Sequence, residues 1–204
     1  MWKKFILTVL LTGVVIPCVH TQESPQDAPR VVYLPADEAF KDESTGLTFN
    51  SRIGGYNKFA VSRNVNPVYG TIIRYQNEVA CGDIYIYSLD SQGNPVSPEA
   101  AEKEFKDVVQ TIRTMPERSS LVEAVTLKSD TGLELPAGVY GQCFQIKANG
   151  EEMKSLLILF LCKGKIVKIR VSYPADDQQE VQSALLFCQE ILKLATGNVA
   201  GTSR

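Results

Sequence analysis

Apolar and polar residues alternate over short runs along most of this chain, and turn residues separate the runs. A period of two is the pattern of half-buried β-strands. A short first strand is predicted over 31–34, and turns at Thr45-Gly46 and Gly54-Gly55 predict hairpins that lead into 56–61. Further strands are predicted over 71–75, 81–89, 121–127, 140–148, 155–162 and 165–173.

Three of these runs differ in how they distribute their side chains. In 81–89, isoleucines occupy one face, and the other face carries Cys81, Asp83, Tyr85 and Tyr87. In 165–173, Lys168 and Arg170 point away from a valine and isoleucine face. The stretch 156–161 is apolar without alternation, which predicts a central strand covered on both faces.

Two segments have helical periodicity instead. From Ser97, a good N-cap, to Pro116, apolar residues recur at spacings of three and four, which predicts an amphipathic helix. A second is predicted over 176–195, where Gly197 is expected to end it. A sheet that needs cover on both faces, with two helices to supply it, predicts an α+β fold. We expect a three-layer α/β/α sandwich with a mainly antiparallel sheet. A cystatin-like sheet wrapped on one helix is the alternative, and the second helix argues against it.

The order of elements resembles the PsbP-like or Mog1-like family, which includes DcrB-type envelope lipoproteins. The segments that carry this resemblance are TGLTFNSRIGGYNKF, IYIYSLD, KIVKIRVSYP and the closing helix, over roughly residues 40–195. It implies a sandwich fold and, for function, an exported protein or a non-enzymatic assembly or binding factor.

The N-terminus has the pattern of a secretory signal peptide. Lys3 and Lys4 precede a short apolar run that Pro17 ends, and this run is shorter than the roughly 20 residues that span a membrane. Cleavage is expected after Thr21 or after Cys18. A lipobox would make Cys18 the acylated N-terminus, but Pro17 stands where a small residue is normally required. The alternative, a buried N-terminal helix, is disfavoured by the polar segment that follows.

This reading divides the chain into a signal peptide (1–21), a flexible linker (22–30), a single domain (31–196) and a disordered tail (197–204). The protein is expected to be exported to the periplasm or outside the cell, with lipid anchoring at Cys18 as the alternative. The chain has 204 residues and a formal charge of −2, and it has no basic block, so nucleic acid is not an expected partner. No later apolar run predicts a transmembrane segment.

Histidine-based catalysis is not expected in the mature chain, because the single histidine, His20, is lost with the signal peptide or stands at the very N-terminus. This removes Ser-His-Asp and Cys-His mechanisms and most zinc hydrolases. Phosphate-binding and nucleophile-elbow motifs are also absent, and no metal or cofactor is expected. A solvated acidic group is formed by Asp37, Glu38, Asp42 and Glu43. Asp83 is the better single carboxylate, and it too is expected at the surface. The protein is predicted not to be an enzyme.

Four cysteines follow the signal segment: Cys81, Cys143, Cys162 and Cys188. A turn at 149–150 places Cys143 opposite residue 156 or 157, too far from Cys162 for a disulfide. Cys162 with Cys188, or Cys81 with Cys143, are candidate disulfides, and buried thiols are the alternative.

The candidate binding residues are aromatic and basic: Tyr85, Tyr87, Arg74, Tyr75, Lys168 and Arg170. Such residues on a sheet face form recognition surfaces, although a covering helix would instead turn the tyrosines into core. We expect a non-catalytic interaction or accessory factor of the bacterial envelope, with an envelope protein or a small ligand as partner. A small-ligand-binding protein is the second hypothesis, and it requires a pocket lined by Tyr85, Tyr87 and Arg74. A carboxylate-based hydrolase is the third, and it requires two facing carboxyls.

Overall fold

The computed structural model describes residues 31–114, 123–125, 133, 135–148 and 151–200. The predicted signal peptide, both cleavage positions, Cys18, His20 and the linker lie outside the described residues. The helix end predicted at Pro116 and the turn predicted at 149–150 lie outside them as well.

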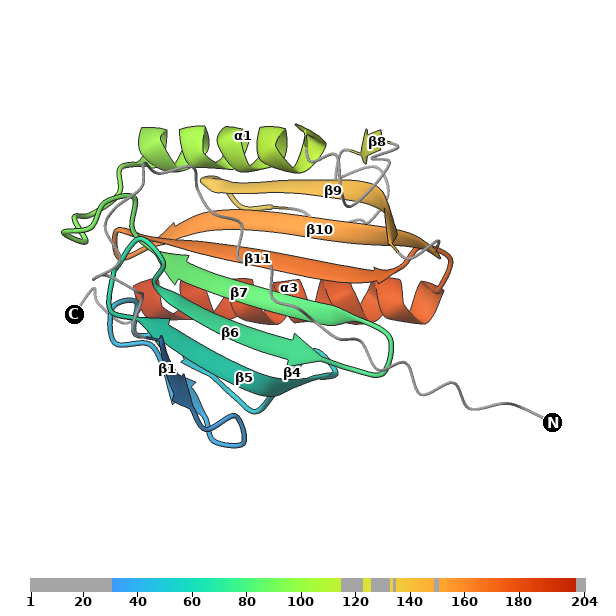
Figure 1. Cartoon of the computed structure of the whole chain (residues 1–204), viewed down its shortest axis with the longest axis horizontal. Helices are drawn as coiled ribbons and strands as arrows, with labels where there is room; N and C mark the ends of the chain where they lie inside the picture. Colours follow the sequence, from blue (N-terminus) through green and yellow to red (C-terminus); the bar gives the residue numbers. More distant parts are fainter. Residues whose placement is uncertain (1–30, 115–122, 126–132, 134, 149–150, 201–204) are drawn as a thin grey trace.

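One long antiparallel sheet dominates the fold (Figure 1). Its strands are β1 (Val31–Leu34), β4 (Arg52–Ile53), β5 (Tyr56–Asn64), β6 (Thr71–Gln76), β7 (Cys81–Tyr87), β8 (Glu123–Val125), β9 (Val139–Ala148), β10 (Glu151–Cys162) and β11 (Lys165–Pro174). They lie in the order β1-β5-β6-β7-β11-β10-β9-β8, and β4 pairs with β5. A separate small hairpin joins β2 (Phe40–Lys41) to β3 (Thr48–Phe49).

The predicted turns form where glycine permits positive φ angles. Gly54 and Gly55 have φ of 55° and 89° and connect β4 to β5, which pair in register. Two successive residues with positive φ define the tight hairpin turn whose twist matches the flanking strands. Gly46, with φ of 72°, lies in the longer turn between β2 and β3, where its amide donates to the Asp42 carbonyl at 2.7 Å. Local turn chemistry thus fixes the first third of the fold.

The helix α3 (Gln178–Ala200) covers one face of the sheet, and in Figure 1 it runs behind β7 and β11. Its apolar side chains pack on the inward-facing residues of β5, β6, β7, β10 and β11. Phe187 lies at the centre of this layer, with its ring centroid 4.9 Å from that of Tyr56 and 5.3 Å from that of Tyr75. This is the larger of the two cores.

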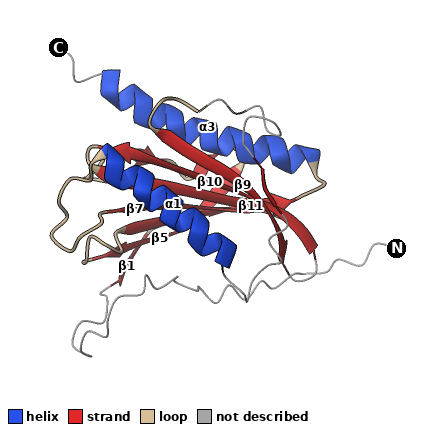
Figure 2. Cartoon of the chain, turned by 90° about the horizontal axis from the view of Figure 1, so that it is seen from above, coloured by secondary structure: helices blue, strands red, loops and turns tan. Residues whose placement is uncertain are grey.

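The helix α1 (Pro98–Thr114) covers part of the opposite face, over β10 and β9 (Figure 2). Phe105 stacks on Tyr140 of β9, with ring centroids 5.6 Å apart, and Ile112 is buried against Leu157 of β10. Successive residues of β10 therefore face α3 and α1 in turn, and every residue over 155–160 is buried. The prediction of a central strand covered on both faces is confirmed, and so is the α+β sandwich.

The end of the last helix was predicted wrongly. We expected Gly197 to stop it and a disordered tail to begin there, but α3 continues to Ala200. Glycine costs about 1 kcal/mol in a helix interior relative to alanine, and it does not block the backbone hydrogen bonds as proline does. Thr196, just before it, donates its hydroxyl to the carbonyl of Leu192 at 3.2 Å, a bond that a threonine makes within a helical turn. In the described part of the chain, no helix combines the length and apolarity that a membrane crossing requires.

Candidate functional site

Three neighbouring strands carry charged and aromatic side chains on the face that α1 partly covers. The register places Arg74 of β6 opposite Asp83 of β7, and Asp83 opposite Arg170 of β11. One row further along, Tyr85 of β7 lies opposite Lys168 of β11. We call this surface the Arg–Tyr face, and it comprises Arg74, Asp83, Tyr85, Tyr87, Lys168 and Arg170.

Tyrosine rings hold the lysine of this face in place. The ammonium of Lys168 lies 4.5 Å from the ring centroid of Tyr85 and 5.3 Å from that of Tyr87, which is cation–π distance. The Tyr87 hydroxyl donates to Glu104 Oε1 of α1 at 2.7 Å, and the Tyr85 hydroxyl donates to Asp83 Oδ2 at 3.2 Å. Tyr87 thus contacts the edge of α1, as expected if a helix covered the tyrosines. Tyr85 instead contacts the charged side chains of Asp83 and Lys168.

A pair of serines supports the same face from the neighbouring strands. Ser155 of β10 and Ser172 of β11 lie opposite each other, with hydroxyl oxygens 3.2 Å apart. Arg170 Nε donates to Ser155 Oγ at 3.3 Å, which fixes the plane of the guanidinium and leaves its terminal N–H groups for other acceptors. The sequence analysis missed both serines. Ser172 lies two residues after Arg170 in the same strand and therefore on the same face, and this spacing in the sequence could have identified it.

The Asp83 carboxylate lies in a half-buried site where opposing effects act on it. Burial raises the pKa of Asp83, and Arg74, the Tyr85 hydroxyl and Arg170 lower it in part, so that the net shift is upward. Burial, followed by the charge of Asp83, raises the pKa of Tyr85. The phenol therefore remains a neutral hydrogen-bond donor, and Asp83 is its acceptor.

The structure brings five of the six predicted binding residues onto this face and separates Tyr75 from them. Tyr75 is fully buried under α3, and its hydroxyl donates to the carbonyl of Asn50 at 2.7 Å. Strand alternation is the reason, because Arg74 and Tyr75 are consecutive in β6 and must point to opposite sides. Tyr75 is a core residue and not a candidate for binding.

None of the four described cysteines is in a disulfide, so neither candidate disulfide is formed. Cys143 pairs with Leu156, as the turn position predicted. Cys81 is half-buried, and Cys162 is buried with its thiol 3.8 Å from the carbonyl of Thr45. Burial raises the pKa of Cys188 to about 12, which keeps this thiol protonated and unreactive.

The acidic group contains one residue that was predicted wrongly. Asp42 is buried, not solvated, and its Oδ1 accepts hydrogen bonds from the Ser44 hydroxyl and from the amide and hydroxyl of Thr45 at 2.6–2.9 Å. These bonds shape the turn between β2 and β3. Asp37, Glu38 and Glu43 are exposed as expected.

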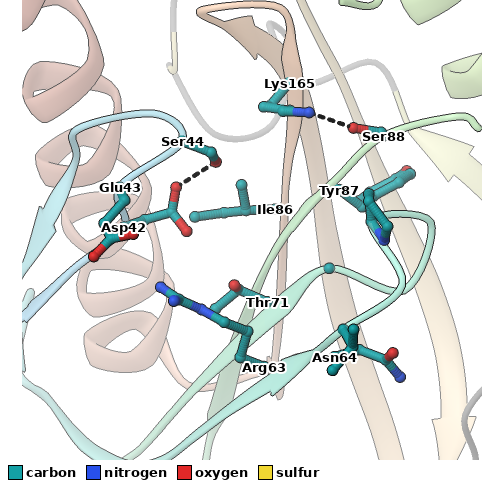
Figure 3. A pocket seen from close by; sticks show the side chains of 13 residues that line it. Asp42, Glu43, Ser44, Arg63, Asn64, Thr71, Ile86, Tyr87, Ser88 and Lys165 are labelled. Atoms are coloured by element: carbon teal, nitrogen blue, oxygen red, sulfur yellow. Dashed lines mark hydrogen bonds between the residues drawn. The ribbon is translucent and has the colours of Figure 1, made fainter. Parts of the chain in front are cut away.

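Two open hollows lie near the sheet, and of the Arg–Tyr face only Tyr87 lines one of them. One, of about 240 Å³, is lined by Asp42, Arg63, Thr71, Tyr87 and Lys165 among others (Figure 3). Lys165 is already engaged there, because it donates to the Ser88 hydroxyl and the Gly93 carbonyl, both at 2.7 Å. The other, of about 420 Å³, is lined by polar residues around Asn57 and Gln76 together with Phe59. Neither contains Tyr85 or Arg74, so neither is the ligand pocket expected from the second hypothesis.

Comparisons with known proteins assign no family. No family model matches the chain, and no curated protein matches it. Among solved structures it is similar to a point mutant of protein Mog1, with 9% sequence identity and a TM-score of 0.31, over 70% of this chain and 93% of that one. So low a TM-score supports no statement about function.

Proposed function

We propose that this chain is an exported, non-catalytic interaction or accessory factor of the bacterial cell envelope, which captures a partner protein on the Arg–Tyr face. Export is inferred from the basic start and short apolar run of the first twenty residues. The observation that carries the binding role is the placement of Tyr85, Arg74, Lys168 and Arg170 side by side on three adjacent strands. Central strands of a sandwich usually bury apolar residues on both faces, so charged residues here point to a surface in use.

A protein partner is favoured over a small ligand because neither hollow is lined by Tyr85, Arg74, Lys168 or Arg170. It is favoured over hydrolysis because Asp83 lies between two arginines, where it has no second carboxylate as its cross-strand neighbour. A glycosidase-type mechanism needs a pair of carboxyls about 5–10 Å apart.

The test is capture from envelope extract by the mature protein, followed by mass spectrometry of the bound species. Replacing Tyr85 and Tyr87 together by alanine is expected to weaken capture of a specific protein while the circular dichroism spectrum stays that of the folded chain. Tyr69→Ala is the control, because Tyr69 is a tyrosine of similar chemistry that is 45% exposed and is not one of the residues of this face. Equal capture by the double variant would refute the role of this face, and a bound small molecule would favour the ligand hypothesis instead. A chain that fractionates with the cytoplasm and retains residues 1–21 would refute export.

A further inference from the structure

We propose that the Arg–Tyr face recognises an extended acidic segment of the partner protein, with two of its carboxylates bound by Arg74 and Arg170. The inference rests on the proposed function, since it names the chemistry of the partner captured at that face. It is carried by the cross-strand row in which Asp83 lies between the two arginines.

Neither arginine is used in a salt bridge within the described structure. The salt bridges found among the described residues are Lys103–Asp107 and Lys106–Glu102, and both are exposed on α1. Arg170 donates its Nε to the Ser155 hydroxyl, and no hydrogen bond of its terminal N–H groups to a described residue is found, which leaves them for an acceptor from outside. Guanidinium groups match carboxylates in a bidentate geometry, which favours carboxylate as the partner group.

The spacing of the arginines suits separate charges on one chain. They stand on strands either side of β7, and adjacent strands lie about 4.8 Å apart, so their backbones are about 10 Å apart. Side chains on one side of an extended segment recur about every 7 Å. Two carboxylates that are two or four residues apart therefore lie about 7 or about 14 Å apart, on either side of the spacing between the arginine backbones. The long, flexible arginine side chains can make up the remaining distance.

Asp83 argues against a single small anion. A phosphate or a lone carboxylate midway between the guanidiniums would lie over the Asp83 carboxylate and be repelled by it. Two carboxylates, one over each arginine, avoid that repulsion. Asp83 then acts as a spacer that selects for charges distributed along a chain.

The charge of the surroundings also favours an acidic partner. In the paired rows of β6, β7 and β11, the cations Arg74, Lys168 and Arg170 surround the single carboxylate of Asp83, and Glu104 of α1 stands at the margin on the Tyr87 hydroxyl. The whole chain carries a formal charge of −2, so this group of cations contrasts with the balance of the chain. Complementary charge of this kind favours the approach and orientation of an acidic segment.

The test uses the mature protein and a fluorescein-labelled peptide of alternating glutamate and threonine, with a glutamine and threonine peptide as the uncharged control. Fluorescence anisotropy is measured at low and at several-fold higher salt. The double variant R74Q/R170Q is expected to weaken binding by about tenfold or more, since both charge-assisted hydrogen bonds to the peptide carboxylates are lost. The matched control is K103Q/K106Q, which removes the same charge from the exposed surface of α1.

Four results would overturn the proposal. Equal losses of affinity in both double variants would mean that the peptide is attracted by the overall charge of the protein and not by the two arginines. Equal affinity for the glutamine peptide would mean that binding does not depend on the carboxylate charge. Binding of inorganic phosphate or of phosphatidylglycerol vesicles through the arginines, without binding of the glutamate peptide, would assign another anion. Circular dichroism confirms folding of each variant.

If R74Q/R170Q still captures the envelope partner that Y85A/Y87A has lost, the proposed function stands and this inference fails. If no partner is captured by any variant, the proposed function fails.

Discussion

Three fully buried tyrosines under α3 differ in how their hydroxyls are satisfied. Tyr75 donates to the Asn50 carbonyl at 2.7 Å, whereas the Tyr56 hydroxyl has no hydrogen-bond partner among the described residues. The Tyr173 hydroxyl has the Cys143 thiol beside it, which is a weak hydrogen-bonding group. A buried hydroxyl without a partner costs about 1–3 kcal/mol, and this cost is offset by the large apolar area of the ring. Tyr56 is thus retained for its volume.

This difference predicts opposite effects for the same chemical change. Tyr56→Phe removes an unsatisfied hydroxyl from the core, so its free energy of unfolding should stay unchanged or rise by up to about 1 kcal/mol. Tyr75→Phe removes a satisfied donor and should lower the free energy of unfolding by about 1 kcal/mol. Urea denaturation of both variants measures the difference. A loss for Tyr56→Phe as large as that for Tyr75→Phe would mean that the Tyr56 hydroxyl has a partner after all.

Tyr75 was predicted to be a binding residue because it is aromatic, but its position in the strand places it in the core. An aromatic residue next to Arg74 was grouped with the arginine, although consecutive strand residues point to opposite faces. Asp42 was misjudged for a related reason, because the polar segment around it suggested exposure while its short side chain satisfies the turn. In both cases the surroundings in space, and not the neighbours in sequence, decided burial.

At the scale of elements, the β4–β5 turn is the point where the sheet and α3 are joined. The amide of Gly54 donates to Glu190 Oε2 of α3 at 2.9 Å. A Cβ atom on Gly54 would lie 2.5 Å from backbone atoms of Phe187, whereas one on Gly55 would meet nothing within 4 Å. Gly54 is thus required by the packing of two elements, and Gly55 by its own turn alone.

The two glycines provide a matched pair of substitutions. Gly55→Ala should lower the free energy of unfolding by about 1–2 kcal/mol, the cost of a left-handed conformation for alanine. Gly54→Ala should cost about 1–3 kcal/mol more, because α3 must move away from the turn. Thermal and urea unfolding of both variants check the order, and equal losses would contradict the close approach of α3.

Most elements could be predicted from periodicity and turn residues, and their ends less well. The strand predicted to reach Leu89 ends at Tyr87, where Ser88 donates its amide to the Pro67 carbonyl at 2.9 Å. The strand predicted to begin at residue 155 begins at Glu151, because its partner β9 extends it through cross-strand pairing. Ends are set by the partner strand or loop, which local pattern does not identify.

At the scale of the whole molecule, buried groups that ionise at high pH limit alkaline stability. Burial raises the pKa values of Tyr56, Tyr75 and Tyr173 above the usual tyrosine range, and that of Cys188 to about 12. In the unfolded chain these groups ionise near pH 10 and pH 8.5. The folded state therefore holds protons that the unfolded state releases, so stability is complete below about pH 8 and falls as pH rises above it.

Each such group should lower the free energy of unfolding by about 1.4 kcal/mol per pH unit, once the pH exceeds the pKa of that group in the unfolded chain. Urea denaturation between neutral pH and about pH 11 measures the slope. Tyr56→Phe removes one ionising group and should make the slope shallower above pH 10 by that amount. An unchanged slope in this variant would show that Tyr56 ionises in the folded state.

The sequence by itself determined the class of fold, because the periods of two and 3.6 and the glycine turns are local properties of the chain. It also determined which residues share a strand face, including Tyr85 with Asp83 and Lys168 with Arg170. Only the tertiary structure decided that β6, β7 and β11 are neighbours in one register, which brings Arg74, Asp83 and Arg170 into a row. Strand order depends on pairing between distant segments and on how two helices divide the two faces between them, and no local pattern encodes either.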